Sequence, residues 1–289
     1  NSLFFNFIIF FGHVMLYRLF IKIYPGSQVW DIMGCFLLTS TLYFSSGIHK
    51  DGLVLLLMAV VIYGVYQSLS KNRISIKRLL FILAGLILLF LVRNFILLAL
   101  LPALFAWILV AKTKWNTALV FISVYLFGGL AFFNINAVIT KINPPDIIVK
   151  KQEAYKSLPI AATQIELAAL QPTVKSFASN IPQALGHVLF LPYPGQQPVK
   201  SLLPFSFELY FYLFLLLLLF FFKKKDNLPA DKLLMFFTLF FILTVFLFIG
   251  YIVPNIGSLI RYRSLYLPFI ITPVLCSLNW EKMRGRFVI

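Results

Sequence analysis

The feature that most constrains this chain is a series of apolar stretches, each long enough to cross a lipid bilayer as a helix. A helix needs about 20 residues to cross roughly 30 Å of hydrocarbon. The stretches lack the apolar–polar alternation of outer-membrane strands. With 61% hydrophobic and 12% charged residues, the 289-residue chain matches neither a soluble domain nor a disordered one. The sequence predicts an all-α, polytopic transmembrane helical bundle.

We expect about nine spans in this fragment. The stretch 79–110 is interrupted by Arg93 and Asn94, which favours two short helices folded into a hairpin over 79–111, with Arg93 at the turn. The chain starts at Asn1 and runs directly into an apolar segment, so we expect an upstream portion to be missing. The expected spans are residues 3–23, 30–46, 52–69, two within 79–110, 115–137, 207–222, 233–253 and 265–278.

Composition divides the chain into three parts. Residues 1–137 and 207–289 are the predicted N-terminal and C-terminal transmembrane regions. Residues 138–206 hold nine of the 15 prolines and most of the glutamines, which is typical of an extramembrane loop. Within this loop, 160–170 and 173–191 are apolar enough to form short interfacial helices on the bilayer surface.

The distribution of Lys and Arg predicts the orientation. Of the 25 basic residues, this layout puts 15 on one side and ten on the other, and six of those ten lie in the long loop, which the positive-inside rule discounts. The side with 15 is therefore predicted to be cytoplasmic, and the long loop faces outward. Those 15 are Arg18, Lys22, Lys71, Arg73, Lys77, Arg78, Lys112, Lys114, Lys223, Lys224, Lys225, Lys232, Lys282, Arg284 and Arg286.

The net charge of +16 does not by itself exclude a function, but the placement of the basic residues argues against one. The basic residues lie at the ends of apolar stretches, where they orient helices and meet anionic lipid, so we do not expect nucleic acid binding. Cys35 and Cys276 lie in apolar stretches without CxxC or His spacing. They are interpreted as core residues, and no metal or cofactor is predicted.

Charged residues near the predicted outer face form the candidate site. A charge in hydrocarbon costs at least about 2.5 kcal/mol, so such residues tend to face a cavity or a partner. Because guanidinium groups pair bidentately with phosphate, an outer-face arginine cluster suits a pyrophosphate headgroup. Snorkelling to the interface and binding of outer-leaflet phospholipid are the alternatives. The residues concerned are His49, Lys50, Asp51, Arg93, Glu208, Arg261 and Arg263.

Two carboxylates are candidate general bases toward a sugar hydroxyl. Lys50 would favour the ionised form of Asp51, although simple pairing of Lys50 with Asp51 is an equally ordinary arrangement. Glu208 begins a span, where an acid is also common for structural reasons. Tyr193, between two prolines, suits either stacking on a sugar ring or interfacial anchoring. His187 fits a structural or interfacial role better than a catalytic one.

Taken in chain order, these motifs resemble a family. They are the tract from Ser45 to Gly52, a basic loop, a short helix ending at Arg93, a large outer loop closing on 191–194, and the Arg261-Tyr262-Arg263 run. Over most of the chain this layout resembles bacterial oligosaccharide repeat-unit (O-antigen type) polymerases and related lipid-sugar-dependent membrane glycosyltransferases.

The resemblance implies transfer of a glycan from a polyprenyl-pyrophosphate carrier at the outer face of the bacterial inner membrane. Arg93, Arg261 and Arg263 would neutralise the leaving pyrophosphate. Asp51 or Glu208 would activate the acceptor, or no base would be needed. His49, Lys50, His187 and Tyr193 would be further substrate contacts. Related enzymes carry an essential acid in the first outer loop, and here that acid is absent or lies upstream of Asn1.

Two other functions remain open at this stage. A transporter or flippase of an anionic lipid or glycan would favour broken helices with charges at mid-depth and an internal repeat, and neither pattern is found. A non-catalytic subunit of an envelope complex would use the long loop to dock envelope-assembly proteins.

Overall fold

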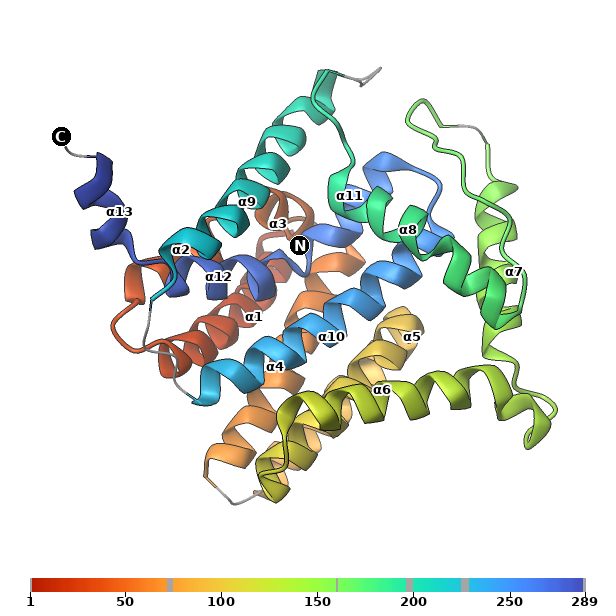
Figure 1. The fold of residues 1–289 in the computed structure, drawn as a ribbon, viewed down its shortest axis with the longest axis horizontal. Coiled ribbons are helices and arrows are strands. Elements are labelled where there is room, and N and C mark those ends of the chain that lie inside the picture. The colour runs from red at the N-terminus through yellow and green to blue at the C-terminus, as the bar shows by residue number, and fades with distance from the viewer. Residues whose placement is uncertain (1, 72–74, 160, 196–199, 225–228, 288–289) are drawn as a thin grey trace. The chain divides into compact units, whose positions relative to one another are not determined.

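The computed structural model describes residues 2–71, 75–159, 161–195, 200–224 and 229–287, which fold into helices joined by connections of different lengths (Figure 1). Within these ranges there is no strand, so the all-α prediction is confirmed. Arg73 and Lys225, counted above for orientation, and Ile160 lie outside the described residues. The α-helices are α1 (Ser2–Ile23), α2 (Gln28–Phe36), α3 (Thr39–Ser45), α4 (Lys50–Ser70), α5 (Ile76–Thr113), α6 (Thr117–Asn134), α7 (Pro144–Lys156), α8 (Val174–Phe190), α9 (Leu203–Phe222), α10 (Pro229–Ile252), α11 (Ile256–Ser264), α12 (Leu267–Ser277) and α13 (Trp280–Phe287).

Six of the described helices are long and apolar enough to cross a membrane: α1, α4, α5, α6, α9 and α10. A seventh span results if α11 and α12, which are bent by 59°, cross together. The predicted count of about nine is not confirmed. One reason is that residues 30–46 form α2 and α3, of nine and seven residues, and neither is long enough to cross.

Helix α5 contains the predicted break. It has 38 residues, which as one straight helix would be about 57 Å long, well beyond the hydrocarbon thickness. Arg93 has φ −152° and ψ 85°, so the helix is interrupted at this residue. The break at Arg93 is confirmed, and the hairpin over 79–111 stays a prediction.

The prediction for residues 160–170 is wrong. The described part, 161–172, is not helical, because several of its backbone groups bond to other segments rather than along a helix. Ile165 N donates to Pro254 O at 2.9 Å, and Leu170 N donates to the side chain of Gln152 at 3.0 Å. A helix is present at the second predicted position, 173–191, as α8, and its place on the bilayer surface stays a prediction. α7 is an additional helix that the sequence pattern did not indicate.

The chain divides into two compact units. Unit 1 comprises Asn1–Leu97, Phe207–Thr238 and Ser264–Ile289, and unit 2 comprises Leu98–Ser206 and Leu239–Arg263.

Small residues allow close helix packing in unit 1. A Cβ at Gly12 of α1 would lie 2.8 Å from Leu56 Cα of α4, and one at Gly34 of α2 would lie 2.7 Å from Thr272 Cα of α12. Such contacts are typical of membrane helices, where packing rather than the hydrophobic effect drives association.

The short helices α2 and α13 are held in unit 1 by aromatic and backbone contacts. Trp30 of α2 stacks on Trp280 of α13 with ring centres 3.9 Å apart. Asn279 N donates to Phe222 O at 2.7 Å, which ties the end of α9 to the start of α13. α2 therefore contacts α12 and α13, segments that lie at the far end of the sequence.

Unit 2 is organised around α8 and α10. A Cβ at Gly250 of α10 would lie 2.7 Å from Ala184 Cα of α8, so these backbones are in close contact. Gln152 of α7 is buried, and its amide donates to Ala168 O and to Tyr251 O. This one side chain therefore joins α7, the 161–172 segment and the end of α10.

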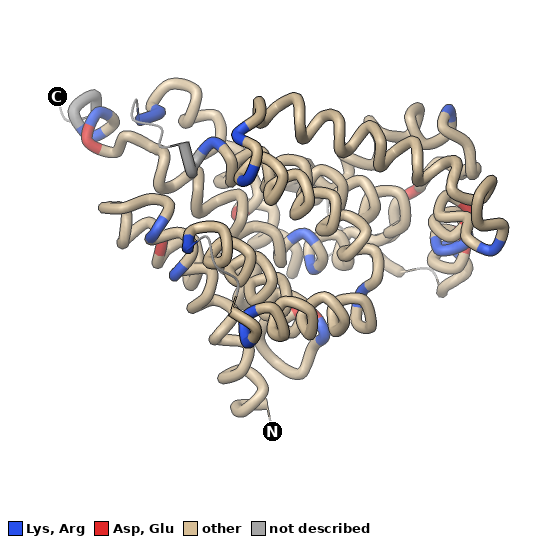
Figure 2. The backbone as a smooth tube through the Cα atoms, turned by 90° about the horizontal axis from the view of Figure 1, so that it is seen from below, with Lys and Arg blue, Asp and Glu red and all other residues tan. Residues whose placement is uncertain are grey.

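The outer surfaces of several helices are apolar. On α6, the exposed side chains include Leu126 and Phe127, which are 62% and 69% exposed. Figure 2 shows the basic residues mainly at helix ends and in connections, with long uncharged helical stretches between them. This pattern is typical of helices that face lipid.

Candidate functional site

The predicted candidates Asp51 and Arg93 meet in unit 1. Asp51 lies in the first turn of α4 and is fully buried, and Arg93 lies at the break in α5. Arg93 Nη2 donates to Asp51 Oδ1 at 2.5 Å, and the two side chains are 11% and 0% exposed. Tyr266 is buried close enough to this ion pair to interact electrostatically with both charges. A non-helical arginine is thus held in place by a carboxylate.

This pairing changes the interpretation of the tract before α4. The sequence left open a pair between Lys50 and Asp51, but the ion pair in the structure is between Asp51 and Arg93, while Lys50 and His49 are exposed. Asp51 already accepts a hydrogen bond from Arg93, so a role as general base would require that bond to be exchanged for one from substrate. The geometry suits Asp51 better as the residue that orients Arg93.

Glu208 also has protein partners in unit 1. Its carboxylate accepts the backbone N–H of Ser40 at 3.0 and 3.2 Å and the hydroxyl of Tyr212 at 2.6 Å. Ser40 lies in the first turn of α3, whose own N-cap residue, Leu38, has no side chain that can accept a hydrogen bond. Glu208 therefore caps α3 from α9, which is a structural role.

Arg263 and Arg261 belong to unit 2 and differ in their surroundings. Arg263 is buried, and its Nη1 donates to Val188 O at 2.6 Å and to Leu191 O at 2.8 Å. These carbonyls are at the C-terminal end of α8, where a cation is favourable. Arg261 is only partly buried. Of the two, Arg261 has the better access for a headgroup, and Arg263 holds the end of α8.

The remaining candidates, Tyr193 and His187, lie at the C-terminal end of α8 and just after it. Tyr193 is 41% exposed and follows α8. His187 is in the last turn of α8, and burial lowers the pKa of its imidazole. Its Nδ1 has no hydrogen-bond partner among the described residues. A neutral His187 at physiological pH is a poor phosphate ligand, which agrees with a structural role.

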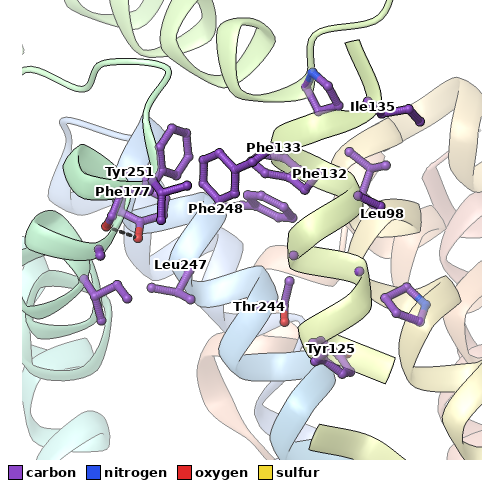
Figure 3. Close-up of a pocket in the computed structure, with 18 of the residues that line it drawn as sticks. Leu98, Tyr125, Phe132, Phe133, Ile135, Phe177, Thr244, Leu247, Phe248 and Tyr251 are labelled. Atoms are coloured by element: carbon purple, nitrogen blue, oxygen red, sulfur yellow. Dashed lines mark hydrogen bonds between the residues drawn. The ribbon is translucent and has the colours of Figure 1, made fainter. Parts of the chain in front are cut away.

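A cavity of about 570 Å³ lies within unit 2. Its wall comes mainly from α6, α8, α10 and the second part of α5, with Pro144 at the start of α7. Figure 3 shows the rings of Phe132, Phe133, Phe177 and Phe248 gathered around one end, with Thr244 and Tyr125 at the other. The volume is within the range of about 300–1,000 Å³ that is usual for small-molecule sites.

The hydroxyl groups in the cavity wall are used by the protein itself. Tyr251 donates to Phe177 O at 2.8 Å, Thr244 to Phe240 O at 2.8 Å, and Tyr125 to Ala99 O at 3.3 Å. The interior is therefore left apolar, as an aliphatic chain would require. On one side of the cavity, at Gly128 and Gly129 of α6, a Cβ would meet no atom within 4 Å.

Sequence reasoning missed two features. The cavity carries no motif, because it is formed mostly by ordinary apolar residues from several helices. Asp31, which is fully buried on α2, was not among the candidates. The available signal was an acid within six residues of a predicted core cysteine, Cys35, but its depth depends on packing that the sequence does not reveal.

Comparison with known protein families, curated proteins and solved structures finds no match. The described residues also contain no group of three or more His, Cys, Asp or Glu side chains that could hold a metal ion.

Proposed function

We propose that this chain is a membrane glycosyltransferase or polysaccharide polymerase that acts on a polyprenyl-pyrophosphate-linked saccharide at the outer face of the bacterial inner membrane. The observation that carries the lipid part of this proposal is the apolar cavity of unit 2. The saccharide part rests on the resemblance drawn from the sequence motifs.

The position of the cavity along α7 and α8 supports a lipid with a polar head. Pro144 of α7 and Phe177 of α8 line the cavity, whereas Tyr155 near the other end of α7 contacts Tyr262, next to Arg261, through the two hydroxyls at 3.4 Å. Along α8, Phe177 and Leu191 are separated by roughly 20 Å at 1.5 Å per residue. An extended amphiphile with its chain in the cavity would place its phosphate toward α11.

The proposed reaction needs few protein groups. An acceptor hydroxyl oxygen attacks the anomeric carbon, the bond from that carbon to the pyrophosphate oxygen breaks, and the electron pair leaves with the pyrophosphate. The hydroxyl proton passes to a base or to solvent. Negative charge grows on the leaving group, so a fixed cation beside it lowers the barrier. We assign this role to Arg261.

A transfer assay in membranes tests the proposal. With a polyprenyl-pyrophosphate-linked oligosaccharide as donor, we expect the wild type to form elongated glycan, visible as a ladder on a gel. Arg261→Gln should lower the rate about 100-fold, which is typical for losing one stabilising donor in a transition state. Normal ladders from Arg261→Gln would contradict the proposed mechanism.

The cavity is tested with a matched pair of glycine substitutions. Gly129 lines the cavity, so a leucine at this position would project into it. Gly186 does not line the cavity, and a Cβ at this position would meet no atom within 4 Å. We expect Gly129→Leu to lose polyprenyl lipid that co-purifies with the wild type, measured by mass spectrometry, and Gly186→Leu to retain it. Equal lipid content in both variants would exclude the cavity as the carrier site.

A further inference from the structure

Asp31 is an unusual group in unit 1. Its side chain is 0% exposed, and its Oδ1 accepts a hydrogen bond from the thiol of Cys276 at 3.1 Å. The second oxygen, Oδ2, is buried and has no hydrogen-bond partner among the described residues. A buried, ionised carboxylate with one unsatisfied oxygen is costly, and taking up a proton removes most of that cost.

The groups that face Asp31 come from three elements. Cys276 lies on α12, Cys35 lies on α2 itself, and Lys224 follows α9. Lys224 Nζ donates to Cys276 O at 3.0 Å and to Ser27 Oγ at 3.5 Å, so its hydrogen bonds go to neighbours of Asp31. The Lys224 charge acts on the carboxyl through space.

A second layer of polar contacts surrounds this group. Cys35 Sγ is 3.9 Å from Thr272 Oγ1 on α12, and His13 Nδ1 on α1 is 2.6 Å from Cys35 O. His13 is buried, and its ring reaches the backbone beside Asp31 rather than the carboxyl. The carboxyl thus lies between α2 and α12 with one thiol donor and one nearby cation.

These surroundings favour the protonated acid in mildly acidic solution, up to about pH 6. Burial raises the pKa of Asp31 to about 6, and the Cys276 hydrogen bond and the Lys224 charge oppose this rise. α2 is too short to be a membrane span, and Lys224, whose charge acts on this group, is only partly buried.

We propose that Asp31, with Cys276 and Lys224, forms a buried proton-binding site, in which Oδ2 takes up a proton from water as the pH falls and releases it as the pH rises. The only bond formed is O–H. The contact between α2 and α12 is then uncharged at Asp31 in mildly acidic solution and carries a negative charge in alkaline solution.

The sign of the effect on stability follows from this difference. The folded state holds the proton up to about pH 6, whereas an unfolded aspartate releases it near pH 4. Between these values the folded state binds more protons, so the free energy of unfolding falls as the pH rises through this window. Above it, the buried charge is a constant cost to the folded protein.

Infrared spectroscopy of the whole chain in detergent tests the site directly. A protonated carboxyl has a carbonyl band that disappears on ionisation. We expect a band with a midpoint near pH 6 in the wild type, its loss in Asp31→Asn, and no change in Asp146→Asn, which removes a carboxyl ion-paired with Lys150 on α7. Lys224→Gln should move the midpoint to higher pH.

Two results would overturn the proposal. One is a band that persists in Asp31→Asn, and the other is a wild-type midpoint near pH 4. If Asp31→Asn does not fold, Cys276→Ala provides the same test, because losing the thiol donor must raise the midpoint. An unchanged midpoint in Cys276→Ala would also overturn it.

Discussion

Two arginines, one buried and one largely buried, stabilise irregular points of this chain in different ways. Arg263 satisfies backbone carbonyls at the end of α8, whereas Arg93 pairs with the carboxylate of Asp51 at a helix break. In both cases, an arginine that the sequence suggests as a ligand for phosphate is already bound by the protein. The third arginine of the candidate set, Arg261, is only partly buried.

Replacing Arg263 should destabilise the protein more than replacing Arg261. Arg263→Leu leaves Val188 O and Leu191 O without their donor, so we expect a loss of about 3 kcal/mol in the free energy of unfolding. Arg261→Leu, two residues away on the same helix and less buried, is the matched control. Thermal unfolding in detergent measures both, and equal losses would show that Arg263 has no special role.

The Asp51–Arg93 pair should behave as a coupled unit. Asp51→Asn leaves a buried guanidinium without its counter-charge, and we expect a loss of about 3–5 kcal/mol. Adding Arg93→Gln should recover part of this loss, because the double variant buries no unpaired charge. Denaturant unfolding of the four proteins gives the coupling energy. Strictly additive losses would mean that the pair does not form.

The sequence identifies these residues but not their partners. Charges in apolar stretches are rare, which is why Asp51, Arg93, Glu208 and Arg263 can be found by inspection. Arg93 lies 42 positions from its partner Asp51, and Ser40 lies 168 positions from its partner Glu208. The pattern of a single sequence does not reveal pairs that are so far apart. Asp31 escapes for the same reason, since its burial depends on α12.

Helices in this fold come into close backbone contact at positions where one of the two helices carries a glycine. The contacts at Gly12, Gly34 and Gly250 each bring a glycine against the backbone of another helix. The long apolar helices are predictable from composition, because hydrocarbon requires length and apolarity. The non-helical structure of the 161–172 segment is not predictable from composition, because partners of its backbone are supplied by Gln152 and by the connection after α10.

Enlarging Gly250 should separate α8 from α10. In Gly250→Val, the added atoms meet the backbone of Ala184, and neither helix can yield without losing other contacts. We expect a destabilisation of about 2 kcal/mol, as for overpacked cores. Gly186→Val on α8, whose Cβ position is open, is the control. Circular dichroism melts would show no difference between the two variants if α8 and α10 did not pack closely.

For the whole molecule, the charge asymmetry predicts a single orientation in the membrane. We expect Asp146→Cys, in α7, to react with a membrane-impermeant maleimide added to intact spheroplasts, and Lys71→Cys to react only after permeabilisation. The native Cys35 and Cys276 are buried and should not react in either condition. Labelling of Lys71→Cys in intact spheroplasts would reverse the proposed topology.

The contacts of α2 have a consequence for biosynthesis. Trp30, Asp31 and Gly34 each meet a partner on α12 or α13, about 240 to 250 residues later in the chain. Translation proceeds from the N-terminus, so α2 leaves the ribosome long before its partners exist. Until the last helices are inserted, an acidic, partly apolar surface on α2 stays uncovered. A nascent chain stalled before α12 would therefore be a natural substrate for membrane quality control, even with its long helices in place.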